Sequence, residues 1–346
     1  MKKHYLNALL ALGLTAPVQA QLARIVVEGT GGPQVFTDIG AAVAAAQTGD
    51  KLYLSGGTFS FSGALVIDKP LHFVGAGIHP DSSSVTGITT IATTSATQIH
   101  TAASGSTFTG IRFYESVMYG NGTTDYAPTG IVFQRCEFGY QMNQGPGSET
   151  NFDECIFRHR LYGNDGISTV TRSIFSFWGN ATHSPISAFG TGGLTMDHCT
   201  VIGGRVSNSP NCNVANCIFT RNSSAPFWQS SGATITNNLC AYTSLVSNMT
   251  PGSATGNVLG VSTTDSLFVN ETSGGYEFSD DLHLLPVSPG IGMATDGTDV
   301  GVYGTSSPYK PGAVPNNPHF QTGVIAPAAD GNGDLPVDIR TEAQTH

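Results

Sequence analysis

Charge is scarce in this 346-residue sequence, and positive charge is scarcest. Asp, Glu, Lys and Arg make up 11% of the residues, with 24 acidic side chains against 14 basic ones and a net charge of −10. A protein that binds nucleic acid or passively captures polyanions needs a positive surface. The composition therefore argues against a nucleic-acid partner. An anionic ligand would have to use the Arg residues in the middle of the chain, or a bridging cation.

Long hydrophobic runs are also missing. No apolar run approaches the roughly 20 residues that a membrane-spanning helix needs. A short one, residues 6–14, follows Lys2 and Lys3, and a small-x-small sequence ends at Ala20. This order of basic, apolar and small residues is typical of a signal peptide. We expect residues 1–20 to be cleaved after Ala20, and the protein to be secreted, periplasmic or at the cell surface without a membrane span.

Helical periodicity is absent as well, and a different repeat takes its place. A six-residue pattern of apolar, two polar, small, any and apolar residues recurs, with its small residue every 18 to 26 positions. A repeat of this size predicts a solenoid, and the abundance of Val, Ile, Thr and Phe favours strands over helices. The six copies begin at Phe133 (FQRCEF), Phe152 (FDECIF), Val170 (VTRSIF), Met196 (MDHCTV), Val214 (VANCIF) and Ile235 (ITNNLC).

The repeat is best explained as strand, bend and strand in each turn of a parallel β-helix. The first and last apolar residues would point inward, and the small residue of the bend would turn into the core. Stacked turns would then place these small residues above one another, as a ladder. The predicted ladder is Cys136, Cys155, Ser173, Cys199, Cys217 and Asn238.

The six cysteines leave two states open. In an exported protein an even number suggests disulfides, and Cys136 with Cys155 or Cys199 with Cys217 would lie within reach. However, the ladder side chains would point in parallel, and Ser173 occupies the same position without sulfur. Buried free thiols are the alternative, and since buried thiols are inert we expect no catalytic cysteine.

A second row precedes the ladder and faces outward. Opposite charges on stacked turns would pair across strands, so we interpret the row as structural. Its members are Arg135, Glu154, Arg172, His198, Asn216 and Asn237.

The two ends of the repeat carry a resemblance to a known family. The segment from Phe36 through "TDIGAAVAAAQTGDKLYL", with Thr37 as the expected N-cap of a short helix, resembles the N-terminal cap of the pectin-lyase-like superfamily. The run "LHLLPVSPGIGMATDGTDVGVYG" is similar to the last coil of exported bacterial members. The resemblance covers about residues 24–304. It implies a right-handed parallel β-helix with a helical cap over 21–304, followed by an irregular tail over 305–346.

For function, the resemblance implies a carbohydrate ligand. The superfamily contains polysaccharide lyases, glycoside hydrolases and epimerases, but also adhesins. The Asn-Thr-Asp, Gly-His-Gly and Arg-x-Lys segments of polygalacturonase-like hydrolases are missing. The expectation is therefore an exported carbohydrate-interacting protein and, if it is an enzyme, a lyase acting on an acidic polysaccharide. The alternative is a non-catalytic structural or adhesive protein.

The strongest candidate site follows Phe157, in the sequence "FRHRLYGND". Arg158, His159, Arg160 and Asp165 offer cations and proton acceptors for neutralising a uronate and abstracting its α-proton. The alternative is that these are solvated turn residues. Residues expected to contact substrate from the same or neighbouring turns are Tyr140, Gln141, Phe177, Trp178, Arg205 and Arg221.

A calcium ion is the one cofactor that the sequence suggests. Asp296 and Asp299 lie in a Gly-containing loop, and such oxygen donors suit calcium. The loop completes no EF-hand pattern, so plain turns are the alternative.

Overall fold

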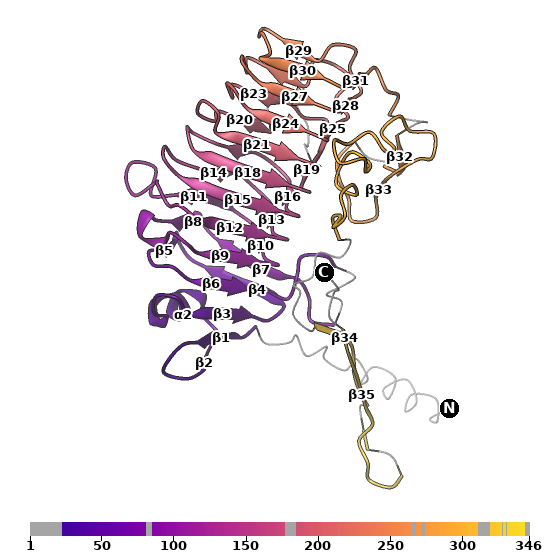
Figure 1. Cartoon of the computed structure of the whole chain (residues 1–346). Coiled ribbons are helices and arrows are strands. Elements are labelled where there is room, and N and C mark those ends of the chain that lie inside the picture. The colour runs from indigo at the N-terminus through magenta and orange to yellow at the C-terminus, as the bar shows by residue number, and fades with distance from the viewer. Residues whose placement is uncertain are drawn as a thin grey trace, which may run out of the picture.

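The computed structural model is a parallel β-solenoid (Figure 1), nearly all of it strand and turn. The predicted signal peptide and the site candidates Phe177 and Trp178 lie outside the residues that it describes. Within them, no helix has the length and apolar character needed to cross a bilayer. The described residues are 23–80, 85–176, 185–263, 267–271, 274–310, 319–326, 328–329 and 331–342.

Three sheets form the walls of the solenoid, and each turn of chain contributes one strand to each wall. Sheet A pairs its strands in parallel, except that β1 is antiparallel to both of its neighbours. In spatial order sheet A contains β2 (Gln34–Phe36), β1 (Ile25–Glu28), β3 (Lys51–Leu54), β6 (His72–Val74), β9 (Thr107–Thr109), β12 (Ile131–Gln134), β15 (Glu149–Asp153), β18 (Ile167–Thr171), β21 (Leu194–Asp197), β24 (Asn213–Ala215), β27 (Thr234–Thr236) and β30 (Ser253–Thr255).

Sheets B and C are parallel throughout. Sheet B contains β4 (Gly57–Phe61), β7 (Thr89–Thr93), β10 (Arg112–Phe113), β13 (Glu137–Phe138), β16 (Ile156–Phe157), β19 (Ile174–Ser176), β22 (Thr200–Ile202), β25 (Ile218–Phe219), β28 (Leu239–Cys240) and β31 (Val258–Leu259). Sheet C contains β5 (Leu65–Ile67), β8 (Ala96–Ile99), β11 (Ser116–Tyr119), β14 (Met142–Asn143), β17 (Leu161–Tyr162), β20 (Ile186–Ser187), β23 (Val206–Ser207), β26 (Phe227–Trp228) and β29 (Val246–Ser247).

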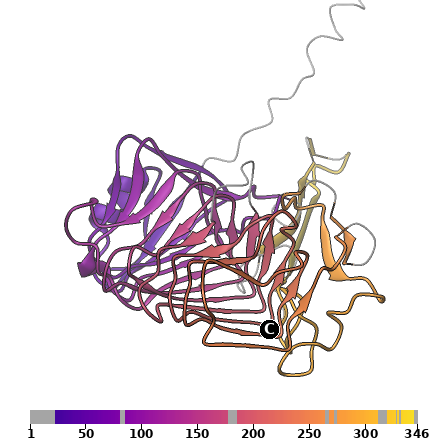
Figure 2. The same ribbon diagram turned by 90° about the horizontal axis from the view of Figure 1, so that it is seen from above.

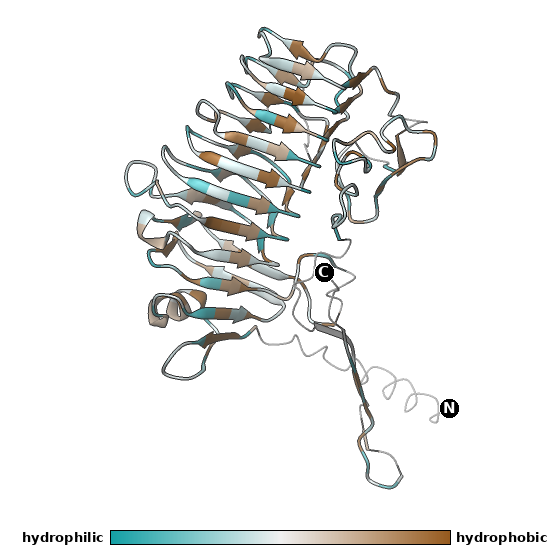
Figure 3. Cartoon of the chain, viewed as in Figure 1, coloured by the Kyte–Doolittle hydropathy of each residue, from teal (hydrophilic) through white to brown (hydrophobic). Residues whose placement is uncertain are grey.

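The six-residue repeat is confirmed as strand, bend and strand. Its first apolar residue is the last but one residue of a strand of sheet A, and its last apolar residue is the second residue of a strand of sheet B, both buried. The Phe rings stack from turn to turn, with centroids 5.3 Å apart for Phe133 and Phe152 and 4.9 Å for Phe138 and Phe157. Figure 3 shows hydrophobic segments, in brown, recurring on the strands of successive turns. Offset or edge contacts between such rings add to the stability of the apolar core.

The small residues of the bends form the expected ladder. Each is buried, and the six cysteines are all free thiols. Burial raises the pKa of the Cys136 thiol to about 12, and the pKa of Cys240 to the same value. Such thiols stay protonated at neutral pH and are poor nucleophiles.

The residue before each ladder position has a left-handed backbone. Its φ lies between 44° and 56° at all six bends, although Arg, Glu and His rarely adopt this conformation. Arg135 and Glu154 form a buried ion pair with Nε 3.1 Å from Oε2, and Arg172 lies 3.9 Å from the other oxygen of Glu154. This confirms the predicted pairing across turns.

The only α-helix among the described residues is α2 (Ile39–Ala45). It packs on β1, β2 and β4 and buries Ile39, Ala42 and Val43. Its N-cap is Asp38, whose side chain accepts a hydrogen bond of 2.7 Å from the amide of Ala41. The expected N-cap, Thr37, is therefore wrong by one residue, because Asp is a preferred cap and its carboxylate also suits the helix N-terminus.

The C-terminal segment, which we define as residues 267–271 and 274–310, returns along the solenoid and covers the outer face of sheet B. Figure 2 shows it lying along one side of the stacked turns. It contains β32 (Phe268–Asn270) and β33 (Asp281–Leu284), which pair antiparallel. A second apolar core lies between it and sheet B, formed by Ile156, Ile174, Ile202, Ile218, Leu239, Leu267, Leu282, Val300 and Val302 among others.

The same segment is hydrogen-bonded to the bends. The residues that it meets run from the last turns back toward the middle of the solenoid, so the segment is antiparallel to the stacking direction. The successive contacts are Asn237 Nδ2 to the carbonyl of Met293 (2.7 Å), the amide of Thr295 to Asn216 Oδ1 (2.9 Å), His198 Nε2 with Thr298 Oγ1 (3.3 Å), Arg172 to the carbonyl of Ser307, and the amide of Lys310 to Glu154 Oε2 (3.2 Å).

The chain from residue 305 onward is more ordered than expected. Residues 305–310 continue the C-terminal segment, and β34 (His319–Ile325) pairs antiparallel with β35 (Val337–Glu342) as a hairpin. The prediction of an irregular tail fails here because Pro, Asn and Asp between the two short strands obscure their pattern.

Candidate functional site

The outer face of sheet C, unlike that of sheet B, is not covered by the C-terminal segment. One residue of each short strand points outward, and parallel pairing aligns these residues in a single column along the solenoid. Polar and aromatic side chains occupy the column in place of the aliphatic ones found under the C-terminal segment. In order the column is Met118, Asn143, Tyr162, Ser187, Ser207, Trp228 and Ser247.

A second column lies beside the first, at the residue two positions earlier in each turn. It carries Gln141, Arg160 and Arg205. The guanidinium carbon of Arg160 lies 4.2 Å from the centre of the Tyr162 ring, and that of Arg205 lies 4.8 Å from the Trp228 ring. Each Arg is thus held flat on an aromatic side chain by a cation–π contact. The two Arg–aromatic pairs flank the small residues of β20 and β23.

Hydrogen bonds fix the orientation of Arg160 further. Its Nε and Nη2 donate to Ser187 Oγ, at 3.1 and 2.8 Å. A guanidinium has five N–H donors in a planar fork, so Ser187 engages only one edge of the group. The remaining donors suit a carboxylate, which Arg binds in a bidentate manner.

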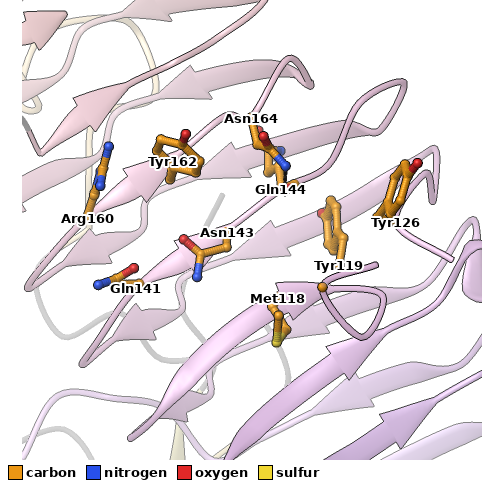
Figure 4. Close-up of a pocket in the computed structure, with 10 residues that line it drawn as sticks. Met118, Tyr119, Tyr126, Gln141, Asn143, Gln144, Arg160, Tyr162 and Asn164 are labelled. Atoms are coloured by element: carbon orange, nitrogen blue, oxygen red, sulfur yellow. Dashed lines mark hydrogen bonds between the residues drawn. The ribbon is translucent and has the colours of Figure 1, made fainter. Parts of the chain in front are cut away.

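A hollow of about 260 Å³ opens beside Arg160 (Figure 4). Figure 4 shows Arg160, Tyr162, Gln141 and Asn143 on one side, and Tyr119 and Tyr126 on the other. None of the described residues that line the hollow is an Asp or Glu. Its lining consists of Met118, Tyr119, Gly122, Tyr126, Gln141, Asn143, Gln144, Arg160, Tyr162 and Asn164.

The floor of the hollow is a network of buried polar groups. The Tyr119 hydroxyl lies 2.5 Å from Thr150 Oγ1, which also accepts a hydrogen bond of 2.7 Å from Gln144 Nε2. Ser168 Oγ donates to Gln144 Oε1 at 2.9 Å. Burial raises the pKa of Tyr119. A connected network of this kind holds its members in one arrangement, so the hollow is preorganised.

Arg160 and Arg205 of this face, and Arg221 near Arg205, are partly desolvated. Burial lowers the pKa of Arg160 and of Arg205, and the pKa of Arg221 is lowered by burial and by the nearby charge of Arg205. An Arg stays protonated at neutral pH even so.

Arg158 does not belong to this face. Its side chain turns to sheet B, where Nε lies 2.9 Å from Glu137 Oε1 and Nη1 donates to the backbone carbonyl of Tyr276. The guanidinium also lies 5.1 Å from the ring centre of Phe278. Arg158 therefore holds the C-terminal segment against the solenoid.

The other two members of the predicted catalytic group are also separate from the hollow. His159 packs against Tyr140 at the corner between sheets B and C, with ring centres 4.5 Å apart and the ring planes tilted by 37°. Asp165 lies at the opposite corner with an exposed side chain and a φ of 62°. Of the four predicted residues, only Arg160 lines the hollow, and among the predicted contact residues Gln141 joins it.

Arg221 lines a different hollow, of about 240 Å³. It is 5% exposed, and its Nε donates to Ser224 Oγ at 2.6 Å. Glu271 of the C-terminal segment lies across this hollow. Arg221 thus lies on the side of the solenoid that the C-terminal segment covers, whereas Arg205 lies on the open side.

The carboxylates of the suggested calcium ligands, Asp296 and Asp299, accept hydrogen bonds from residues close to them in the sequence. Asp296 Oδ1 accepts from the amide and hydroxyl of Thr298, at 3.0 and 2.7 Å, and Asp299 Oδ1 accepts from the amide of Gly292 at 2.9 Å. Among the described residues, no group of three or more His, Cys, Asp or Glu side chains could hold a metal ion.

Several residues of this face were not selected from the sequence. Tyr162 and Asn143 follow predicted residues by two positions, Arg160 and Gln141, and so share their side of a strand. That spacing is the signal that would have found them. Trp228 has Pro226 two positions before it and no predicted residue there, so only the stacked register shows that Arg205 reaches it.

Comparison of the chain with known proteins found no matching family model and no matching curated protein. The geometry of sheet C therefore supplies the argument for function.

Proposed function

We propose that the protein is an exported solenoid of the pectin-lyase-like type that binds an acidic polysaccharide along the outer face of sheet C. The observation that carries this proposal is the pair of Arg–aromatic contacts, Arg160 on Tyr162 and Arg205 on Trp228. The signal-like residues 1–20 support export, and the resemblance of the repeat and its ends supports the superfamily.

The spacing of the two pairs suits an extended chain. Arg160 and Arg205 are two strand steps apart, or about 10 Å at the usual distance between strands. Guanidinium groups recognise carboxylates, and the faces and edges of Tyr and Trp suit the apolar side of a sugar ring. The serines between the pairs, Ser187 and Ser207, are nearly buried and leave the path between them low. A linear polymer with regularly placed carboxylates fits this surface.

The chemistry of the hollow favours binding over hydrolysis. Glycosidases of the usual kind need two carboxylates that face the scissile bond, and the lining of the hollow contains none within the described residues. β-Elimination requires instead a cation to neutralise the uronate and a group to accept its α-proton. Arg160, with its lowered pKa, and the hydroxyls of Tyr126 and Tyr162 support a lyase as the second candidate.

The test combines binding and turnover. The mature protein would be incubated with acidic and neutral polysaccharides, with and without calcium. Retardation in polysaccharide gels would report binding, and absorbance of unsaturated uronates would report cleavage. We expect Arg160→Ala and Arg205→Ala each to weaken binding of the acidic polymer about tenfold, equal to ~1.4 kcal/mol. Arg24→Ala, an exposed Arg away from sheet C, is the charge-matched control and should bind normally.

The outcomes separate the alternatives. Absorbance that disappears in Arg160→Ala would establish the lyase. Binding without absorbance would establish a non-catalytic carbohydrate-binding protein. Absence of binding to every polymer, or binding that Arg160→Ala and Arg205→Ala leave unchanged, would refute the proposal.

A further inference from the structure

The hairpin of β34 and β35 projects away from the solenoid (Figure 1) and exposes apolar side chains. Ile325 is 65% exposed, Val337 51% and Ile339 57%. The two strands form a sheet of their own within the described residues. An isolated two-stranded hairpin is only marginally stable in water, and additional strands are what usually stabilise it.

The hairpin has one apolar side and one polar side. Ile325 lies opposite Val337 in the pairing register, and Ile339 follows Val337 by two positions, so all three share a side. Asp338 and Arg340 point to the other side. The solenoid meets this apolar side at Gly323, the partner of Ile339, where Val85 lies close by, but the three apolar side chains remain more than half exposed.

The backbone of β35 presents a free edge with a defined register. The amide of Ala326 donates to the carbonyl of Pro336 at 2.9 Å, so these two residues form a hydrogen-bonded pair. Hydrogen-bonded and non-hydrogen-bonded pairs alternate along an antiparallel ladder. Ile339 therefore falls in a non-hydrogen-bonded pair, with its N–H and C=O directed away from β34. The backbone N–H and C=O groups of Val337 and Thr341 also point away from β34, because their direction alternates along a strand.

We propose that two copies of this chain pair through β35, antiparallel and centred on Ile339. The symmetric register places Ile339 opposite Ile339 of the second copy as a hydrogen-bonded pair, and Val337 opposite Thr341. Asp338 then lies opposite Arg340 of the second copy, twice by symmetry. These are non-hydrogen-bonded positions, where side chains approach most closely.

Charge complementarity is what selects a second copy as the partner. An isologous contact requires each residue to meet its complement when the same surface is turned onto itself. The sequence Asp338–Ile339–Arg340 meets this requirement about its central residue. Opposite charges across strands stabilise pairing and like charges oppose it. The dimer forms a four-stranded sheet in which the apolar sides of both hairpins are continuous.

This proposal is tested by the oligomeric state of the mature protein. Light scattering after size exclusion and sedimentation over a concentration series should show a dimer that dissociates on dilution. Ile339→Lys should give a monomer, and its exposed position means that the fold is unaffected, as circular dichroism would verify. Val35→Lys is the control, because it adds the same charge at an exposed apolar residue of β2, outside the hairpin.

Charge exchange tests the register itself. Asp338→Arg and Arg340→Asp should each weaken the dimer several-fold, since each places like charges opposite one another. The double variant Asp338→Arg/Arg340→Asp should recover wild-type association, and an equimolar mixture of the two single variants should form a mixed dimer. A wild-type protein that is monomeric at every concentration would overturn the proposal. So would a dimer that survives Ile339→Lys or that ignores the charge exchange.

Discussion

Arg158 and Arg160 are two positions apart, and the molecule uses them in opposite ways. Arg158 lies under the C-terminal segment, paired with Glu137 and donating to the carbonyl of Tyr276. Arg160 lies on the open face of sheet C, stacked on Tyr162 beside a hollow. Sheets B and C are built from the same turns of chain, so their difference in use comes from a segment outside the repeats.

Turns built from one repeat thus present two different outer faces. The outer residues of sheet B are aliphatic, such as Ile156 and Ile174, and they are buried only because another segment packs over them. The outer residues of sheet C are polar or aromatic and do not. Once sheet B is covered, a ligand as long as a polysaccharide has sheets A and C available, and only sheet C combines Arg with aromatic rings.

Arg158→Ala should produce the largest effect, and it should fall on stability alone. Glu137 would remain 2% exposed without its closest cation, and breaking a buried ion pair costs about 3–5 kcal/mol. Arg160→Ala, by comparison, should cost no more than ~1 kcal/mol of stability while weakening polysaccharide binding. Denaturant unfolding, followed by circular dichroism, would measure the free energy of unfolding of both variants.

A double variant would sharpen this contrast. Glu137→Gln removes the charge that Arg158 neutralises, so Arg158→Ala should cost less in that background. If Arg158→Ala instead abolished polysaccharide binding in a fully folded protein, the assignment of the two arginines to different tasks would be wrong.

The repeat could be predicted because each turn solves the same packing problem. Phe133 and Phe138 had to point inward, and Cys136 had to be small, for the bend to close on the core. The left-handed backbone of Arg135 and Glu154 was not predictable, because such residues rarely adopt it. Their conformation is maintained by the ion pair between them and by contacts with residues far along the chain.

The site was harder to predict than the fold. The sequence analysis selected the stretch "FRHRLYGND" as one site, but the structure places its four candidate residues apart. Alternation along a strand places Arg160 with Tyr162, whereas Arg158 is drawn to residues 118 positions away. The pairing of Arg205 with Trp228 depends on stacking between turns. Local sequence contains neither the return path of the C-terminal segment nor the register between turns.

Substitution of Asn237, which contacts the C-terminal segment, should have an intermediate effect on stability. Its φ is 51° and its Nδ2 donates to the carbonyl of Met293 at 2.7 Å. Asn237→Gly removes that bond but tolerates the left-handed backbone, and should cost ~1 kcal/mol. Asn237→Ala adds a further ~1 kcal/mol of backbone strain. Thermal unfolding of the two variants would give the order, and an alanine variant as stable as the glycine one would contradict it.

The smallest effect should be a pH dependence of the contact between the bends and the C-terminal segment. Desolvation by burial raises the pKa of Asp197. The hydrogen bond and charge attraction to His198, together with the hydrogen bond from Asn216, act in the opposite direction. Their combined effect is larger, so the pKa of Asp197 is lowered overall. A lowered pKa means that the folded state prefers the ionised carboxylate. Its contribution is therefore complete above the ordinary Asp value near 3.9 and is lost as pH falls through the lowered pKa.

Because the Asp197 side chain is 42% exposed, the contribution should stay below ~1 kcal/mol. His198 links Asp197 to Thr298, so the loss should loosen the C-terminal segment before the solenoid unfolds. Hydrogen exchange of residues 293–298 between pH 6 and pH 3 would detect it. Asp197→Asn should remove this part of the pH dependence, whereas the exposed Asp165→Asn, on the side of sheet C, should not. Equal responses of the two variants would show that acid acts on the solenoid as a whole and not on its covered side.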